Sequence, residues 1–480
     1  MLFNSLHFLI FFPVVTAMFF AAPTRYRLPL LFVASCYFYM AFIPAYILIL
    51  FLLIAVDYGA GLLIERAEGP SRKRLLIVSL VANIGILGVF KYFNFFSANV
   101  AALSRALGVP VHPAILDLAL PIGLSFHTFQ SMSYTIEVYR GRWKAERNLL
   151  VYAVYVLFFP QMVAGPIERP YNLLPQLRRD VRFDVERAKE GLRLMLWGFI
   201  MKVVVADRLA LYANQVFDNP AGHHGLTTAL GIYCFSFQIY CDFAGYSLIA
   251  IGAAWLLGYR LMTNFRTPYF AASISEFWQR WHISLSTWFR DYLYIPLGGN
   301  RVVPWRWYVN LMIVFLVSGF WHGANWTFIV WGGLHGLYLI GAIVLEPARR
   351  WFLRLLRVPA AGHAARVAGI VITFHLVSLA WVFFRARSMG DAFLILRNLT
   401  YLEPLGRLTF EYPLGASDFT LAIMAMLGLV TAEALRGRFR LSAALAQGPG
   451  WVRWGVYYAA AFGILFLGVL NQSRFIYFQF

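Results

Sequence analysis

The sequence predicts an all-α protein that crosses a membrane many times, and three observations support this prediction. Hydrophobic residues make up 60% of the 480 residues and charged residues only 13%, whereas about 25% is usual in soluble domains. Apolar stretches long enough to cross about 30 Å of hydrocarbon recur along the whole chain. The alternation of apolar and polar residues that marks a membrane β-barrel is absent, so helices must satisfy the backbone groups inside the lipid.

The first third of the chain contains five candidate spans, at residues 6–22, 28–44, 46–64, 75–96 and 118–138. The first basic residue, Arg25, follows the first of these segments, so the positively charged start of a cleavable signal peptide is missing and the segment is expected to remain as a span. Basic residues alternate between loops, with clusters after the first, third and fifth spans. This alternation predicts an N-terminus outside the cytoplasm.

Seven further apolar segments follow, at residues 149–163, 192–205, 226–257, 309–345, 367–384, 419–434 and 456–470. The first of them is short and ends at a proline and a glycine, which indicates a re-entrant segment. The segment 309–345 is too long for one crossing, and Gly319, Gly323 and Asn325 at its middle predict a bent hairpin or two broken helices. We expect about ten or eleven crossings plus re-entrant and interfacial helices around a central tunnel, in one domain over residues 1–480.

Charge and motifs exclude several classes of function. The net charge is +19, but Lys and Arg lie in short loops between spans rather than on one basic face, so the expected partner is a lipid bilayer and not nucleic acid. The three cysteines lack the spacing of a zinc site, and no metal is expected. Sequence signatures of serine hydrolases, zinc proteases and nucleotide-binding motors are absent.

Ionisable residues inside apolar spans are costly, so each is a functional candidate, and His322 is the strongest. It lies beside Gly323 in the predicted helix break, where a substrate can approach the backbone closely. If the segment is locally helical, Asn325 and Trp326 share its face, so Asn325 would orient the imidazole and Trp326 would wall a tunnel. The alternative is a histidine that only hydrogen-bonds a neighbouring helix.

Two other histidines flank this candidate. His335 lies thirteen residues after His322, about 220° around a continuous helix, so it is expected to face elsewhere unless the break resets the angle. His282 lies in residues 277–292, where aromatic and charged residues interleave as in an interfacial helix. It is either a contact at headgroup level or a second polar group at the entrance to the site.

The other ionisable residues of the spans are expected to be structural. Asp57, Lys91 and Asp242 would pair with one another or with an arginine such as Arg208. The remaining histidines are assigned to helix-to-helix hydrogen bonds (His127 and His375) and to a solvated loop (His223 and His224).

Taken together, six short motifs resemble the membrane-bound O-acyltransferases, and most of all the bacterial branch that O-acetylates exopolysaccharides such as alginate. They are Trp-His-Gly at 321–323, Arg-Trp-His at 280–282, Trp-Phe-Arg-Asp-Tyr at 288–292, Tyr-Cys-Asp-Phe-Ala-Gly-Tyr-Ser at 240–247, Tyr-Ile-Pro-Leu-Gly-Gly-Asn-Arg at 294–301 and Phe-Ile-Tyr-Phe-Gln-Phe at 475–480. The resemblance implies that His322 is the catalytic histidine and His282 the second conserved polar position of the family.

The resemblance also implies an activity, an enzyme of the bacterial inner membrane that moves acetyl groups from a cytoplasmic donor, acetyl-CoA, toward a periplasmic exopolysaccharide. A separate periplasmic acetyltransferase would then load the polymer, and no tightly bound cofactor is expected. A base with a pKa near neutrality, such as His322, is suited to taking the acceptor hydroxyl proton. The alternatives are cellulose or peptidoglycan as acceptor, a lipid acyltransferase, and a transporter without covalent chemistry, against which the absence of internal repeats argues.

Overall fold

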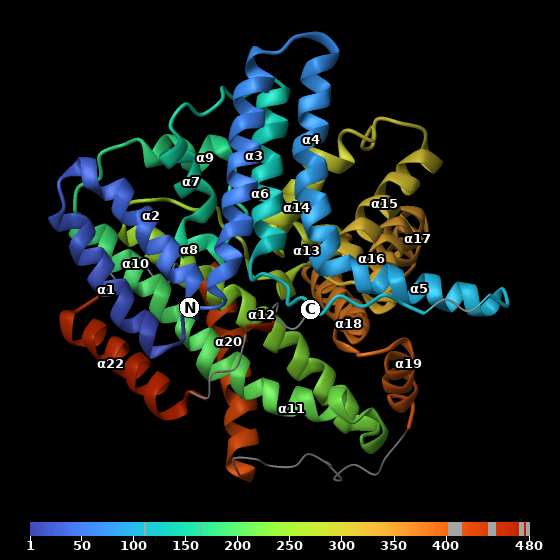
Figure 1. The fold of residues 1–480 in the computed structure, drawn as a ribbon. Coiled ribbons are helices and arrows are strands. Elements are labelled where there is room, and N and C mark those ends of the chain that lie inside the picture. Colours follow the sequence, from blue (N-terminus) through green and yellow to red (C-terminus); the bar gives the residue numbers. More distant parts are fainter. Residues whose placement is uncertain (110–111, 164, 402–414, 440–447, 470–474, 477–480) are drawn as a thin grey trace. The chain divides into compact units, whose positions relative to one another are not determined.

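The computed structural model describes residues 1–109, 112–163, 165–401, 415–439, 448–469 and 475–476, and Figure 1 shows their arrangement in helices. These residues form no strand, which confirms the all-α prediction. Within this part of the chain, six helices are long and apolar enough to cross a membrane, and the shorter helix α1 (Leu6–Ala21) is apolar too. The count of ten or eleven crossings and the central tunnel stay predictions.

The chain forms two compact units that interleave along the sequence. The first unit contains Met1–Met195 and Ser247–Thr263, and the second contains Leu196–Tyr246 and Asn264–Phe480. Helices α10 (Val185–Phe199) and α12 (Gly225–Leu256) belong partly to each unit. The prediction of a single domain over the whole chain therefore stays a prediction.

Helices α3, α4 and α6 lie side by side in the first unit (Figure 1). Its other elements are α1, α2 (Thr24–Met40), η1 (Pro44–Tyr46), α3 (Ile47–Arg66), α4 (Gly69–Leu87), η2 (Gly88–Tyr92), α5 (Phe93–Ala106), α6 (Leu124–Tyr139), α7 (Leu149–Leu157), α8 (Phe159–Met162) and α9 (Pro170–Leu177). Ser79 of α4 joins all three helices, because its hydroxyl lies 2.7 Å from Asp57 Oδ1 and 3.0 Å from Thr135 Oγ1.

The carboxylate of Asp57 accepts hydrogen bonds from uncharged side chains. Ser79 donates to its carboxylate, and Asn83 Nδ2 lies 3.0 Å from Oδ1 and 2.9 Å from Oδ2. The expected ion pair of Asp57 with Lys91, Asp242 or an arginine is therefore wrong. Asp57 therefore helps to hold these helices together, and its hydrogen bonds offset the cost of burying a polar side chain.

Two predicted boundaries in the first unit differ from the structure. The apolar segment predicted as 75–96 begins at Gly69 and continues through the π-helical turn η2 into α5, where an extra residue per turn interrupts the regular α-helix. The span predicted to begin at residue 118 becomes helical only at Leu124, after Gly123 adopts a φ of +75°. This left-handed conformation favours glycine, and it keeps the residues before Leu124 out of the helix.

The segment predicted to be re-entrant forms two short helices, α7 and α8, of nine and four residues. Neither is long enough to cross about 30 Å of hydrocarbon. Their side chains from Val151 to Val163 are buried within the protein. This arrangement agrees with the rule that interrupted helices at membrane depth must be covered by protein rather than lipid.

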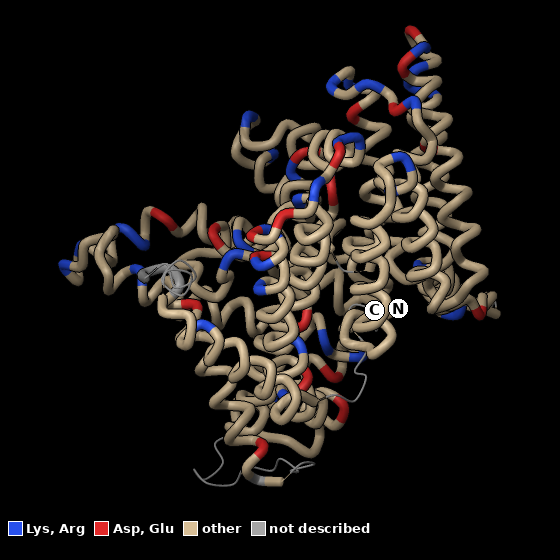
Figure 2. The backbone as a smooth tube through the Cα atoms, turned by 90° about the vertical axis from the view of Figure 1, so that its left-hand side faces the viewer, with Lys and Arg blue, Asp and Glu red and all other residues tan. Residues whose placement is uncertain are grey.

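The second unit contains the larger part of α12, the most deeply buried of the six long helices, whose apolar window is 83% buried. Its other elements are η3 (Ile200–Ala206), α11 (Asp207–Asp218), η4 (Pro220–Gly222), η5 (Pro268–Phe270), α13 (Ile274–Arg280), α14 (Ile283–Phe289), η6 (Arg290–Tyr294), α15 (Pro304–His322), α16 (Trp326–Val344), α17 (Glu346–Leu355), α18 (His363–Arg385), α19 (Met389–Asn398), α20 (Ala416–Phe439) and α22 (Gly450–Leu467). Figure 2 shows that charged residues lie mainly at helix ends and in loops.

Helices α15 and α16 form the predicted bent hairpin and pack closely because glycines meet at their interface. A Cβ atom on Gly319 would lie 2.3 Å from the carbonyl oxygen of Phe328, and one on Gly332 would lie 2.2 Å from that of Phe315. Small residues allow the backbones of membrane helices to approach each other in this way. The hairpin brings its turn, which contains His322, against α18.

Candidate active site

His322 is the last residue of α15, and the chain is extended at the next residue, Gly323. The new helix starts at Trp326, because the Asn325 side chain accepts a hydrogen bond of 3.1 Å from the Thr327 backbone amide. Asn325 Nδ2 donates to the Arg387 carbonyl oxygen at 3.2 Å. Asn325 therefore caps α16, and the expectation that it orients the His322 ring is wrong because the segment is not helical there.

The His322 side chain is buried among aromatic rings from three helices. Its ring centroid lies 4.8 Å from that of Trp321 on α15, 5.0 Å from that of Trp331 on α16 and 5.4 Å from that of Phe384 on α18. These apolar walls lower the local dielectric constant, which strengthens electrostatic interactions within the site. The position at a helix C-terminus adds a negative dipole end, which stabilises positive charge on a ring that takes a proton.

Trp326, the other expected neighbour on that face, is 53% exposed and begins α16. The ring that walls the His322 site is instead that of Trp331, five residues and about 1.4 turns further along the helix. Because the break reverses the direction of the chain, residues of α16 contact His322 from a separate helix that packs beside α15. Their spacing along the sequence therefore does not follow a continuous helix.

His335 belongs to the same aromatic region, so the direction expected from a continuous helix is wrong. Its ring centroid lies 5.0 Å from that of Trp331, which lies one turn earlier on α16 and also contacts His322. The Trp278 indole N–H donates to His335 Nδ1 at 3.3 Å. Since an indole nitrogen only donates, the proton of neutral His335 is on Nε2.

His282 is fully buried in the second unit, which rules out the predicted contact at headgroup level. It lies at the N-terminus of α14 with a φ of 42° and a ψ of 54°, a left-handed conformation. Its ring packs edge-on against that of Phe243 on α12, with centroids 4.6 Å apart. Sequence reasoning placed this residue at an interface because its neighbours alternate between aromatic and charged types, but the short helices α13 and α14 turn the ring inward.

A polar contact holds the His282 ring in place. Its Nδ1 lies 3.0 Å from Oδ1 of Asn264, and that oxygen also accepts from the backbone amide and the hydroxyl of Ser284, at 3.4 and 3.0 Å. Asn264 is fully buried. Sequence reasoning missed Asn264, because nothing in the sequence around it indicates that its amide is buried against His282.

Aromatic side chains connect the surroundings of His282 and His322. Trp281, next to His282, has its ring centroid 5.0 Å from that of Trp381 on α18. The Trp381 ring stacks on that of Trp331 at 5.7 Å, and Trp331 contacts His322. The two histidines predicted from the sequence thus belong to one aromatic cluster of the second unit, formed by α13, α14, α15, α16 and α18.

A buried ion triad, formed by Lys202, Asp207 and Asp242, lies on η3, α11 and α12 of the same unit. Lys202 Nζ lies 2.7 Å from Oδ1 of Asp207 and 2.7 Å from Oδ1 of Asp242. Asp242 Oδ2 also accepts the backbone amide of Ile476 at 2.7 Å. Asp242 is paired as expected, but Lys202 is the partner that sequence reasoning missed, despite its position within an apolar segment. Arg208, the expected partner, is paired with Asp418 instead.

The other histidines follow the predictions in part. His375 Nε2 lies 3.0 Å from the Tyr233 hydroxyl, which joins α18 to α12 and confirms the expected helix-to-helix hydrogen bond. His127 is buried on α6, with its ring centroid 6.4 Å from that of Tyr39. His223 is buried rather than solvated, and its backbone carbonyl oxygen accepts a hydrogen bond from Asn398 Nδ2 of α19 at 3.0 Å.

Glu168 is a buried carboxyl group of the first unit that sequence reasoning did not single out. It accepts from the backbone amide of Met262 and from Asn172 Nδ2, both at 2.6 Å. Burial raises the pKa of Glu168 to about 7. Its position after a glycine and a proline, outside the apolar segments, gave no signal that it would be enclosed.

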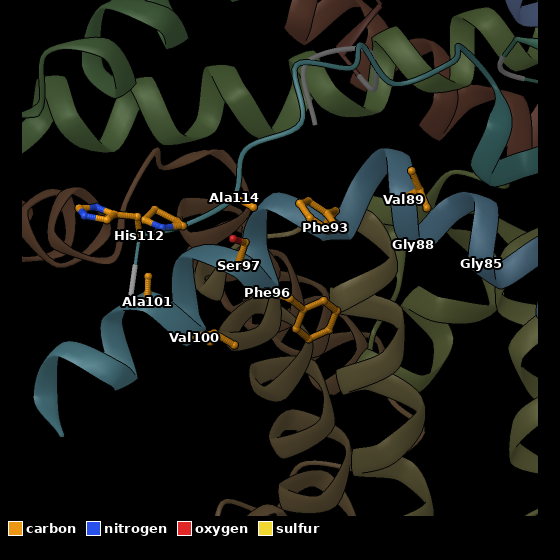
Figure 3. Close-up of a pocket in the computed structure, with 11 residues that line it drawn as sticks. Gly85, Gly88, Val89, Phe93, Phe96, Ser97, Val100, Ala101, His112 and Ala114 are labelled. Atoms are coloured by element: carbon orange, nitrogen blue, oxygen red, sulfur yellow. The ribbon is translucent and has the colours of Figure 1, made fainter. Parts of the chain in front are cut away.

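Two further points on the described residues bear on ligand binding, namely metal sites and an apolar cavity. No group of three or more His, Cys, Asp or Glu side chains in this part of the chain could hold a metal ion. An apolar cavity of about 510 Å³ opens in the first unit between α5 and residues 112–114, lined by Phe93, Phe96, Val100 and His112 among others (Figure 3). None of the candidate histidines of the second unit lines it, so we assign it no part in the chemistry.

Comparisons with known proteins agree with these motifs. A model of the membrane-bound O-acyltransferase family matches residues 111–383, which include His282 and His322. The chain is 40% identical to a probable alginate O-acetylase of Azotobacter vinelandii over 82% of this chain and 76% of that protein, and 40% identical to one of Pseudomonas aeruginosa over 82% and 73%. It is 36% identical to a peptidoglycan O-acetyltransferase of Helicobacter pylori over 78% and 73%.

Proposed function

Because the chain belongs to the membrane-bound O-acyltransferase family, we propose that it transfers acetyl groups from a cytoplasmic donor toward a periplasmic exopolysaccharide, with His322 as the general base. The proposed donor is acetyl-CoA, the proposed polymer is alginate, and the proposed location is the bacterial inner membrane. The observation that carries the assignment of His322 is its burial at the end of α15, enclosed by rings from three helices.

The proposed reaction is a direct acyl transfer. His322 takes the proton of the acceptor hydroxyl as its oxygen attacks the thioester carbonyl, the new C–O bond forms, and the C–S bond breaks. The thiolate of the donor leaves and takes up a proton, so the imidazole returns to its neutral form. The C-terminal end of the α15 dipole favours the transient positive charge on the ring.

His282 is the second proposed participant. It lies in the same aromatic cluster as His322, and its ring is held by a hydrogen bond to Asn264. An imidazole with a fixed orientation is suited to positioning a substrate or moving a proton. No acyl-enzyme is needed in this scheme.

The choice of acceptor polymer is supported by the names of relatives. Alginate is favoured by several relatives named as probable alginate O-acetylases, each about 40% identical to this chain. Peptidoglycan is the second candidate, favoured by the relative from Helicobacter pylori. A periplasmic acetyltransferase that loads the polymer is the proposed partner.

Transfer from radiolabelled acetyl-CoA by the purified full chain in detergent tests the reaction. We expect His322→Ala to abolish transfer while the protein remains in the membrane fraction at normal yield. His375→Ala is the matched control, since this histidine also lies on a long apolar helix and only joins α18 to α12. Equal transfer by the His322 variant and the wild type would refute the assignment of the base.

The acceptor is tested in cells. A deletion strain that carries the wild-type chain or the His322 variant is grown, and the acetyl content of its alginate and its peptidoglycan is measured separately. Loss of acetyl groups from alginate alone would support the first candidate. Loss from peptidoglycan alone would replace it with the second.

A further inference from the structure

The backbone at His282 is held in an uncommon conformation by Asn264. His282 has a φ of 42°, which few residues other than glycine adopt. The next residue, Ile283, donates its backbone amide to the Asn264 carbonyl oxygen at 2.9 Å. The side chain and the backbone of Asn264 thus contact the same turn, although the two residues lie 18 positions apart in the sequence.

The hydrogen bonds identify which nitrogen of His282 carries the proton. Ser284 donates its backbone amide to the terminal atom of Asn264 that faces His282, and a backbone amide can only donate, so this atom is the amide oxygen. His282 Nδ1, 3.0 Å from the same oxygen, must therefore donate as well. The neutral ring then has its lone pair on Nε2.

His335 has the opposite tautomer. Trp278 donates to its Nδ1, so its proton is on Nε2. The aromatic cluster thus holds one imidazole prepared to accept at Nε2 and another prepared to donate there. Because a buried polar partner fixes each tautomer, the difference is built into the packing.

We propose that Asn264 is the positioning residue of His282, which fixes the Nδ1-protonated tautomer and so makes His282 a proton acceptor at Nε2 during acyl transfer. This inference rests on the proposed participation of His282. In this role Nε2 takes the proton that His322 has removed from the acceptor hydroxyl, and it releases that proton to the donor thiolate as the C–S bond breaks, so that both rings end neutral. The Asn264 oxygen then stabilises the imidazolium through the shortened Nδ1–H hydrogen bond.

The surroundings of the ring are consistent with this role. Its faces and edges pack on Phe243 and Phe265, at centroid distances of 4.6 and 6.4 Å. The charged groups of the packed elements are Arg266, Asp242 in its pair with Lys202, and the ion pair of Arg280 with Glu276 on α13. The backbones of the two arginines are hydrogen-bonded to each other. Burial lowers the pKa of His282 to about 3, so the ring is neutral at physiological pH.

The test is the pH dependence of kcat for acetyl transfer by the purified full chain. Asn264→Asp places a carboxylate against Nδ1–H, which should raise the pKa of His282, so the acid limb of kcat should move about one to three units to higher pH. Asn264→Ala should lower kcat roughly 10- to 100-fold, as loss of a ring-orienting partner does in metal sites. A wild-type profile for the Asp variant at normal yield would overturn the proposal.

Asn310→Ala is the matched control. Asn310 is also a fully buried amide of the second unit, but it donates to the carbonyl oxygens of Leu297 and Gly299. Its removal should lower protein yield without moving the pH profile. A shift of the same size in this variant would show that the effect on pH reflects general loosening, and would overturn the proposal.

Two further variants separate the inference from the function it rests on. Wild-type kcat in His282→Ala would refute the participation of His282, whereas a loss of kcat in that variant combined with a wild-type profile in Asn264→Asp would refute only the role of Asn264. If Asn264→Asp does not fold, Ser284→Ala removes one donor to the same oxygen. It should lower kcat several-fold with KM unchanged, and wild-type kcat there would overturn the proposal.

Discussion

His322 and His335 both pack against the indole of Trp331, each with its ring centroid 5.0 Å from that of the tryptophan. His322 belongs to α15, whereas Trp331 and His335 lie one turn apart on α16. The tryptophan is fully buried and therefore sets the distance between the two imidazoles. The position of the proposed base thus depends on the packing of the hairpin as well as on the break after α15.

Replacing Trp331 should separate packing from ring chemistry. Trp331→Ala leaves a cavity beside His322 and should lower the free energy of unfolding by about 3 to 5 kcal/mol. Trp331→Phe keeps an aromatic wall and should retain most transfer activity. Thermal unfolding in detergent and acetyl transfer measure the two effects. Full activity in the Ala variant would show that this wall does not position His322.

The close contact of α15 and α16 should make Gly332 intolerant of a side chain. A Cβ there would lie 2.2 Å from the Phe315 carbonyl oxygen, so Gly332→Ala should push the helices apart, reduce the folded yield and lower transfer by moving His322. Gly341→Ala is the matched control on the same helix, because a Cβ there meets nothing within 4 Å. Equal yields and rates for both variants would contradict this account of the hairpin.

The buried ion triad should depend strongly on its cation. Lys202→Met leaves Asp207 and Asp242 without their shared partner, and the uncompensated charge should lower the free energy of unfolding by about 3 to 5 kcal/mol. Lys189→Met, which breaks an exposed pair with Glu186, should change it by less than about 1 kcal/mol. Unfolding of both variants in the same detergent is the measurement, and similar shifts would refute the difference between buried and exposed pairs.

The raised pKa of Glu168 predicts that stability falls as pH rises. Its pKa is about 7 in the folded protein and 4.5 is its ordinary value, so between these values the folded chain binds more protons than the unfolded chain. The free energy of unfolding must therefore decrease with pH across this window. We expect the Tm in detergent to be higher at pH 5 than at pH 8, and Glu168→Gln to weaken this dependence. An unchanged dependence in the variant would assign it to other groups.

Features that depend on neighbouring residues could be read from the sequence. The recurring apolar stretches predicted membrane helices, because each span must bury its own backbone polar groups. The glycines around His322 predicted the break between α15 and α16. Because ionisable residues within apolar spans are costly, the sequence also indicated that His322 and Asp242 have a role. The hydrogen bond of His375 to another helix followed from the same reasoning.

Features that depend on distant residues required the tertiary structure. The hairpin reverses the chain, so His335 faces the region of His322 although a continuous helix would turn it away. Asn264 and Lys202 acquire their roles only when separate segments bring His282 and Asp242 to them. Helical periodicity is a local property, whereas the partner of a buried polar group is chosen by packing between segments far apart in the chain. The sequence by itself therefore determined the membrane helices and the candidate base, and the tertiary structure decided what surrounds and orients the histidines.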